Sequence, residues 1–163
     1  MSRKETTGDS SLERVRQALS AFGMEHRVVE LSSSTRTAQE AASALGVSVA
    51  QIAKSLVFLC GEEAIVVIAS GANRVSVEKL RVHLGQEIRR ADAEGVRKAT
   101  GFAIGGVPPL GHLKSLRTLI DQDLLCHREI YAAAGTPRSI FRLNPRELMH
   151  ITQGQALDLR EEG

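Results

Sequence analysis

A glycine–proline loop and a single lysine are the parts of this sequence best suited to chemistry. The loop runs from Thr100 to His112 and places four glycines and two adjacent prolines between apolar residues. Glycine permits a close backbone approach or a positive φ, and proline fixes φ and removes an N–H. Such a loop is rigid and lined by backbone. It suits either a small polar ligand or a tight structural crossover.

Phosphate binding is one chemistry that the loop excludes. The segment 106–111 has the glycine spacing of a Walker A loop, but a histidine and a leucine follow it where Lys and Ser or Thr are required. The prolines also remove N–H groups that would cradle phosphate. The N–H groups of Gly105, Gly106 and Val107 remain, and such donors can hold a carbonyl oxygen or stabilise an oxyanion.

Lys54 lies where a short expected helix meets an apolar strand, beside Leu56, Val57 and Phe58. A lysine in this position either extends its ammonium group to water along the strand end or supplies a functional cation at a cleft. The residues alone leave both interpretations open.

Polar and glycine residues also follow several expected strands. Ser70 and Asn73 lie in the turn 70–74, Asp121 ends an apolar strand, and Gly135 and Thr136 precede a proline. Side chains at strand ends can line a pocket or orient a substrate amine, and they can equally form plain turns. We include these residues among the candidates for substrate binding.

Metal chemistry has little support in the sequence. The histidines and cysteines show no HxxxH, CxxC or HxE spacing, and no serine or cysteine lies in a nucleophile elbow. These residues are His26, His83, His112, His127, His150, Cys60 and Cys126. We therefore expect no metal and no cofactor. Two cysteines form no disulfide framework, which is typical of a reduced, cytoplasmic protein.

Composition predicts one globular domain. The chain has 163 residues, of which 42% are hydrophobic and 25% charged, and its net charge is +2. No apolar run is long enough for a membrane helix, so we expect no membrane partner. The small net charge argues against a large nucleic-acid-coating surface, and the scarcity of aromatics argues against base-stacking modules. We expect a disordered tail over residues 1–9 and a single domain over residues 10–163.

The expected elements follow from capping signals and apolar periodicity. Capping boxes at 10–13, 37–40, 48–51 and 144–147 predict helix starts, and Asp92 predicts another. A hairpin is predicted over 54–60 and 64–69, a helix over 76–84, and strands over 26–31, 117–121, 129–133, 139–143 and 156–159. Strands occur in pairs without strict βαβ alternation, which predicts an α+β fold with a mixed, barrel-like sheet surrounded by short helices.

The order of the motifs resembles the YbaK/ProX family of free-standing aminoacyl-tRNA deacylases, which is related to the editing domain of bacterial prolyl-tRNA synthetase. The matching segments are Thr37 to Ala42, Leu45-Gly46, Lys54 to Phe58, Ala99 to Gly111 and Ile120 to Leu124. The resemblance covers roughly residues 12 to 159, nearly the whole expected domain.

The resemblance implies a trans-editing hydrolase. Its substrate would be the ester between a wrong amino acid and the 3′-terminal adenosine of a tRNA, with tRNA(Pro) as the usual acceptor. Lys54 matches the family's indispensable lysine, and Gly105 and Gly106 match the loop glycines whose backbone faces the aminoacyl group. The ester is already activated, so positioning and oxyanion stabilisation suffice without a protein nucleophile. In the family, a ribose hydroxyl of the substrate is thought to assist.

Around these catalytic positions we expect substrate contacts from a further set of residues: Val107, Pro108, Ser70, Asn73, His112, Asp121, Gly135 and Thr136. Candidate tRNA contacts are Arg36, Arg74, Arg89, Arg90, Arg97 and Lys98. The expected partner is the tRNA acceptor end, with prolyl-tRNA synthetase as a second candidate; the oligomeric state is left open.

Pro108 departs from the family pattern. Cysteine-specific members have a serine at this position, so the amino acid stays open among alanine, serine, threonine, cysteine and small non-protein amino acids. The alternative function is a non-catalytic module of the same fold that binds aminoacyl-tRNA or a synthetase.

Overall fold

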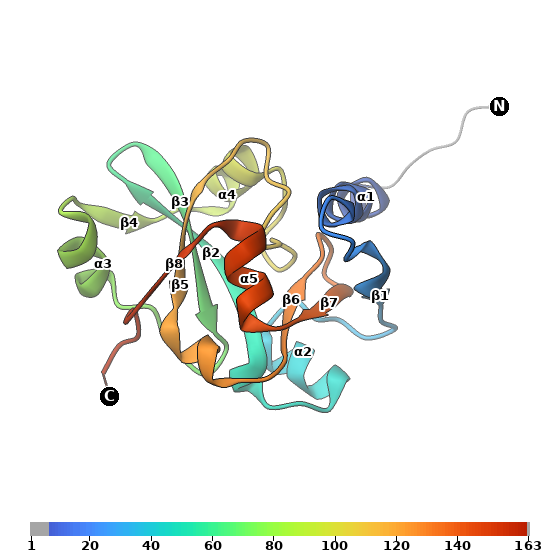
Figure 1. Cartoon of the computed structure of the whole chain (residues 1–163). Helices are drawn as coiled ribbons and strands as arrows, with labels where there is room; N and C mark the ends of the chain where they lie inside the picture. The colour runs from blue at the N-terminus through green and yellow to red at the C-terminus, as the bar shows by residue number, and fades with distance from the viewer. Residues whose placement is uncertain (1–6, 163) are drawn as a thin grey trace.

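The computed structural model describes residues 7–162, in which eight strands join in one mixed sheet. The order is β1-β7-β6-β2-β3-β5-β8, and β4 pairs separately with β2 (Figure 1). The strands are β1 (Val28–Glu30), β2 (Ile52–Cys60), β3 (Glu63–Ser70), β4 (Ile88–Arg90), β5 (Arg117–Asp121), β6 (Ile130–Ala133), β7 (Ser139–Leu143) and β8 (Gln155–Leu157). The pairs β2–β6, β3–β5 and β5–β8 are parallel and the others antiparallel, which confirms a mixed sheet.

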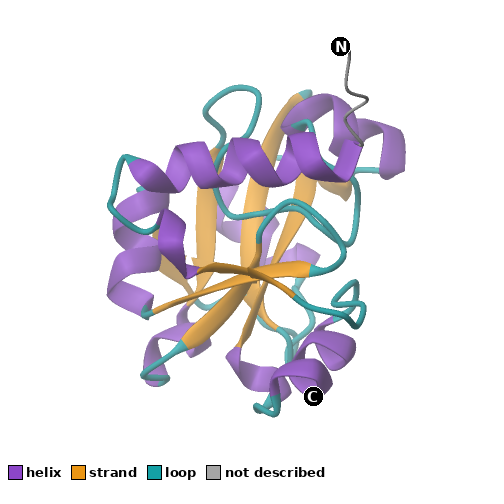
Figure 2. Cartoon of the chain, turned by 90° about the vertical axis from the view of Figure 1, so that its right-hand side faces the viewer, coloured by secondary structure: helices purple, strands orange, loops and turns teal. Residues whose placement is uncertain are grey.

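Short helices surround this sheet, as expected for the α+β class. They are α1 (Thr7–Ser20), α2 (Ala38–Leu45), α3 (Val77–Leu84), α4 (Ala93–Thr100) and α5 (Pro145–Thr152). Figure 2 shows helices on both sides of the strands. In Figure 1, α3 lies beside β4 at one side of the molecule and α1 lies near β1 at the other.

The β2–β3 hairpin forms the centre of the sheet, with Ala53 paired to Ser70 and Cys60 to Glu63. Alternate β2 residues enter two different apolar clusters: Ala53 and Val57 pack in one, Phe58 and Cys60 in the other. Both faces of the hairpin are therefore covered. This explains why its sequence is a nearly continuous apolar run rather than an alternating one.

One edge of β2 is interrupted. On this edge, β6 pairs with Ile52 and Ala53, and β4 pairs with Phe58 to Cys60. Between them, residues 54–57 have no strand partner on this edge within residues 7–162, although the Val57 carbonyl accepts a hydrogen bond from Ala91 N–H (3.1 Å). The gap leaves an opening in the sheet next to Lys54.

Most capping signals mark real helix ends. Thr37 and Glu40 form a complete capping box at α2, and Asn144 and Glu147 form another at α5. Asp92 caps α4 through the Gly95 N–H. The box at 48–51 also forms and opens the 3₁₀ helix Val49–Gln51.

The expected start of the first helix is wrong. We predicted a capping box at 10–13, but α1 begins at Thr7, so Ser10 and Ser11 lie inside the helix. Ser11 is buried there, and the backbone of Gly135 packs against its carbonyl. Tertiary packing thus overrides the local signal. Of the expected tail 1–9, residues 1–6 lie outside the described residues, and the rest opens α1.

The strands at the two ends of the chain differ in extent from the prediction, and one further strand was missed. The first strand is limited to β1, because a 3₁₀ helix, Glu25–Arg27, replaces its expected start. The last strand, β8, begins and ends earlier than predicted. β4 was not predicted, because two of its three residues are exposed arginines and it lacks an apolar pattern.

Candidate functional site

A cavity of about 330 Å³ lies beside the gap in the sheet. Its walls come from β2, the beginning of α2, β6 and the loop residues Ile104, Gly105 and Val107. This volume falls in the range of small-ligand sites, roughly 300–1,000 Å³. The cavity therefore joins the two features that stood out in the sequence, the lysine strand and the glycine–proline loop.

Lys54 is half-buried at this cavity, and its charge has no acidic neighbour there. The pKa of Lys54 is lowered, first by desolvation and then by repulsion from Arg90 and Arg74, while Asp121 opposes the shift. Arg36 and Arg90 also line the cavity, and none of its described lining residues is an aspartate or glutamate. A site of this charge attracts a ligand with anionic or strongly polar oxygens.

The start of the loop is shaped by two close contacts. Gly105 has φ +98°, and a β-carbon there would lie 2.6 Å from Arg36 Cγ. Gly106 packs on the backbone of Thr136, where a β-carbon would lie 3.0 Å from the N, Cα and C atoms. Glycine is therefore required at both positions, at Gly105 by backbone conformation and at Gly106 by space.

The three expected oxyanion donors differ in availability. The Gly106 N–H donates to the Ala103 carbonyl (3.1 Å), so it is occupied inside the turn. Gly106 also does not line the cavity, whereas Gly105 and Val107 do. Within residues 7–162, the N–H groups of Gly105 and Val107 have no hydrogen-bond acceptor. Of the three expected donors, these two therefore remain for a ligand.

Pro108 and His112 lie behind the cavity wall. Pro108 is buried, and its carbonyl accepts a hydrogen bond from His112 Nε2 (2.8 Å). The His112 ring faces a second cavity of about 250 Å³ and contacts Phe102 edge-on. Burial lowers the pKa of His112, against the effect of the Pro108 hydrogen bond. His112 thus fixes the far side of the loop.

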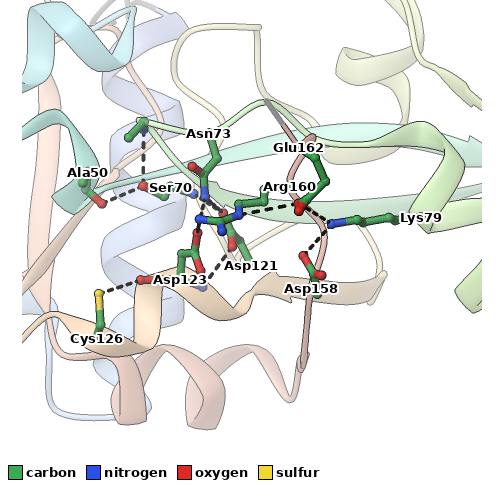
Figure 3. A network of polar contacts seen from close by, with 11 residues as sticks. Ala50, Ser70, Asn73, Lys79, Asp121, Asp123, Cys126, Asp158, Arg160 and Glu162 are labelled. Carbon is green, nitrogen blue, oxygen red and sulfur yellow. Dashed lines mark hydrogen bonds and ion pairs between the residues drawn. The ribbon is translucent and has the colours of Figure 1, made fainter.

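Ser70, Asn73 and Asp121 form a polar network that does not line the cavity (Figure 3). Asp121, which is 1% exposed, accepts hydrogen bonds from Ser70 N (3.1 Å) and Asn73 Nδ2 (2.9 Å) on one oxygen. Its other oxygen accepts from Asp123 N (2.9 Å). Asp123 in turn pairs with Arg160 near the C-terminus. The network ties the ends of β3 and β5 together.

Gly135 and Thr136 support the loop from outside the cavity. Gly135 has φ +103°, and a β-carbon there would lie 2.8 Å from the Ser11 carbonyl oxygen. Thr136 presents its backbone to Gly106 and its hydroxyl to Ser139 Oγ (2.7 Å). Neither residue lines the cavity, so their contacts act on the loop that does.

The candidate tRNA-binding residues divide by position. Arg36 and Arg90 line the cavity, and Arg74 lies near enough to lower the pKa of Lys54. The remaining candidates are exposed away from the cavity lining: Arg89, Arg97 and Lys98.

Most of the cavity lining was not expected from the sequence, and Ser55 and Ile104 are two such residues for which a signal exists. Ser55 is a hydroxyl residue inside an apolar strand, and that contrast is the signal by which it could be found. Ile104 is 56% exposed at the cavity, and an exposed isoleucine between glycine-rich residues is a comparable signal.

No three or more His, Cys, Asp or Glu side chains are grouped closely enough in residues 7–162 to hold a metal ion. In the same range, none of the helices combines the length and apolar character needed to cross a lipid bilayer.

Comparison with known proteins identifies the family. The model of the aminoacyl-tRNA editing domain matches residues 32–151. The protein YwhH of Bacillus subtilis is 33% identical over 143 residues, covering 87% of this chain and 91% of YwhH. A candidate Cys-tRNA(Pro)/Cys-tRNA(Cys) deacylase, EbsC of Enterococcus faecalis, is 23% identical over 125 residues and 76% of each chain.

A solved structure supports the same assignment. The crystal structure of a candidate trans-editing enzyme for prolyl tRNA synthetase superimposes with a TM-score of 0.88. The two chains are 49% identical, and the match covers 93% of this chain and 98% of the other. The matched region of the family model contains Lys54 and the whole glycine–proline loop. The chain therefore belongs to the aminoacyl-tRNA editing domain family, as its resemblance to the YbaK/ProX proteins implied.

Proposed function

We propose that this protein is a trans-editing deacylase that hydrolyses the ester of mischarged aminoacyl-tRNA, with tRNA(Pro) carrying a small non-cognate amino acid as its substrate. The observation that carries the proposal is the cavity at the β2 gap. There, Lys54, whose pKa is lowered, lines one cavity with Gly105 and Val107, whose N–H groups have no acceptor among the described residues, and no carboxylate residue lines that cavity. The family, and the names of EbsC and of the structural neighbour, support this substrate class.

The chemistry suits these groups. Water adds to the ester carbonyl carbon, the carbonyl oxygen becomes an oxyanion, and collapse of the intermediate expels the 3′-ribose oxygen. That oxygen takes up a proton, so free amino acid and an uncharged tRNA result. The Gly105 and Val107 N–H groups are the donors for the oxyanion, and a ribose hydroxyl of the substrate assists the attack on the ester.

Lys54 acts as a cation that positions the terminal nucleotide. Its ammonium group is a compact point charge that can hold phosphate or ribose oxygens of the 3′ end. Arg36 and Arg90, on the same cavity, extend this positive surface toward the acceptor stem. The proposed substrate is a product of tRNA aminoacylation in the cytoplasm, so the reaction takes place there, and prolyl-tRNA synthetase is the enzyme whose errors it would correct.

Turnover tests the proposal. The purified protein is mixed with an excess of tRNA(Pro) charged with alanine, serine, threonine, cysteine or proline, and release of each amino acid is followed. We expect many turnovers on at least one small non-cognate amino acid and little on proline. Binding of the charged tRNAs without turnover would instead favour a non-catalytic binding module, and neither binding nor turnover would refute both functions.

A salt titration tests the partner. An acceptor-end ligand makes few phosphate contacts, so log Kd should rise with log salt concentration with a shallow slope of about one unit per phosphate contact. Arg36→Ala should reduce that slope, and Arg128→Ala, an exposed arginine outside the cavity lining, should leave it unchanged.

A further inference from the structure

Arg14, on α1, contacts the beginning of the glycine–proline loop in two ways. Its Nη2 donates a hydrogen bond to the Gly101 carbonyl (2.5 Å). Its guanidinium carbon lies 4.3 Å from the centre of the Phe102 ring, which is the geometry of a cation–π interaction. Arg14 precedes the loop by almost 90 residues along the chain, so these contacts join two distant segments.

The carbonyl that Arg14 binds lies at the end of α4. Gly101 is the C-cap of this helix, with φ +84°. The last carbonyls of a helix lack partners within the helix and lie at the negative end of its dipole, so a guanidinium group is favoured there. A β-carbon on Gly101 would lie 2.5 Å from Arg14 Nη1, which shows how closely the two residues approach. The arginine therefore fixes the point where the helix passes into the loop.

Phe102 connects this point to the far side of the loop. Its ring is fully buried and meets the His112 ring edge-on, with the centroids 6.4 Å apart. His112 Nε2 in turn bonds the Pro108 carbonyl (2.8 Å). Because Pro108 directly follows Val107, this series of contacts runs from Arg14 to the residue next to one of the two free N–H donors.

The other free donor lies in the turn that follows Phe102. This turn is closed by the hydrogen bond from Gly106 N–H to the Ala103 carbonyl (3.1 Å), and Gly105 lies within it. The position of the turn is set at its start, where Phe102 is held against Arg14. Both free N–H groups are thus placed by anchors that meet at the Phe102 ring.

Other residues of α1 contact the end and the support of the loop. Gly111 lies against α1, where a β-carbon would be 3.4 Å from the Ala18 Cβ. Gly135 packs on the Ser11 carbonyl, directly before Thr136, whose backbone supports Gly106. One helix therefore contacts the loop at its start, at its end and through its support. This helix lies outside the residues 32–151 that match the family model.

We infer that Arg14 is a positioning residue for deacylation, whose guanidinium group holds the base of the loop and thereby places the Gly105 and Val107 N–H groups where the oxyanion forms. The inference rests on the proposed deacylase function. Arg14 is not part of the described cavity lining, so it acts through the loop and not on the substrate. Donors to an oxyanion stabilise the transition state more than the bound ester, so their displacement should appear in kcat.

Arg14→Met tests the inference by kinetics. Methionine keeps part of the aliphatic stem and removes the hydrogen bond and the charge. On the charged tRNA(Pro) that the wild-type protein hydrolyses fastest, we expect kcat to fall at least about tenfold and KM to change by less than about twofold. Unchanged kcat, or a rise in KM alone, would overturn the inference. If Arg14→Met does not fold, Arg14→Gln is measured in the same way.

Two control variants separate positioning from general stability. Arg27→Met breaks the ion pair with Glu147 (2.7 Å), which does not involve the loop. It should lower the unfolding temperature and keep the wild-type kcat. Arg16→Met changes another partly buried arginine of α1, for which the described chain shows no hydrogen bond or ion pair to the loop, and should also keep the wild-type kcat. If kcat falls in Arg27→Met as much as in Arg14→Met, stability and not positioning explains the loss.

Amide NMR spectra test the position of the loop without catalysis. Arg14→Met should move the amide resonances of Gly105 and Val107 further from their wild-type positions than Arg27→Met or Arg16→Met does. Resonances that stay in place would overturn the inference even if kcat falls. Hydrolysis of none of the charged tRNAs by the wild-type protein would overturn the deacylase function, whereas the amide resonances would still report whether Arg14 holds the loop.

Discussion

Gly105 lies directly beneath the Arg36 side chain, so close that a β-carbon on Gly105 would be 2.6 Å from Arg36 Cγ. The contact joins the glycine–proline loop to Arg36, the residue that precedes the α2 N-cap, and both residues line the cavity. Arg36 and the loop backbone are therefore positioned by each other, and a change at one is expected to move the other.

Gly105→Ala tests this relationship. The alanine must adopt φ +98° and displace Arg36, so we expect unfolding to become easier by about 1–2 kcal/mol and kcat/KM for deacylation to fall at least about tenfold. Gly85→Ala is the matched control. It also has a positive φ, +66°, but has open space around it and lies at the end of α3. It should show the stability loss with wild-type kcat/KM; a similar loss of activity there would contradict the local explanation.

Lys54→Met separates charge from packing. Methionine keeps most of the aliphatic stem and removes the ammonium group, so we expect kcat/KM to fall by about 10²-fold or more. The free energy of unfolding should stay the same or rise, because the lost charge is desolvated and repelled by two arginines. Urea denaturation and deacylation kinetics on the same preparation measure both. Full activity in Lys54→Met would refute the catalytic assignment.

The pH dependence of deacylation should report the protonation state of Lys54. Because its pKa is lowered, the cation is lost at a lower pH than for an ordinary lysine, and kcat/KM should fall as pH rises through that value. Arg74→Ala removes one source of repulsion, so the pKa rises and the alkaline limb moves to higher pH. Arg128→Ala, an exposed arginine that does not affect Lys54, should leave the limb unchanged. Rates are corrected for spontaneous ester hydrolysis at each pH. If Arg74→Ala leaves the alkaline limb of kcat/KM at the same pH, a group other than Lys54 is its origin.

Asp121→Asn distinguishes a role in substrate binding from a role in the fold. The buried carboxylate accepts hydrogen bonds from three groups, on Ser70, Asn73 and Asp123, so the amide should destabilise the protein by roughly 1–3 kcal/mol. Activity per folded molecule should stay near wild type. The alkaline limb should move slightly to lower pH, since Asp121 raises the pKa of Lys54. A large fall in kcat/KM at unchanged stability would instead place Asp121 at the substrate.

Local sequence signals predicted much of the fold. The caps at Thr37, Asp92 and Asn144 each mark a helix start, because a side chain bonds the first free N–H groups within three residues along the chain. The β2–β3 hairpin could be predicted equally well, since two apolar runs flank a short turn. Features of this kind depend on neighbours in sequence, and they can be predicted from it.

The position of the cavity depends on distant strands. Ser70 and Asp121 end the parallel neighbours β3 and β5 and meet at one end of the sheet, away from the cavity that we expected them to line. The cavity lies on the opposite edge of β2, where β6 leaves the strand before β4 joins it. No local pattern encodes where two partners that both lie far downstream of β2 along the chain stop pairing. The same register places Lys54 at an opening rather than in a packed sheet.

The interrupted edge of β2 also means that part of this site is main chain. The Val57 carbonyl faces this edge, and alternate residues of a strand direct their polar backbone groups to the same side, so the N–H and C=O of Ser55 face it too. Substitution changes side chains but leaves these groups in place. The polar groups along this edge of the cavity are thus independent of which side chains β2 carries.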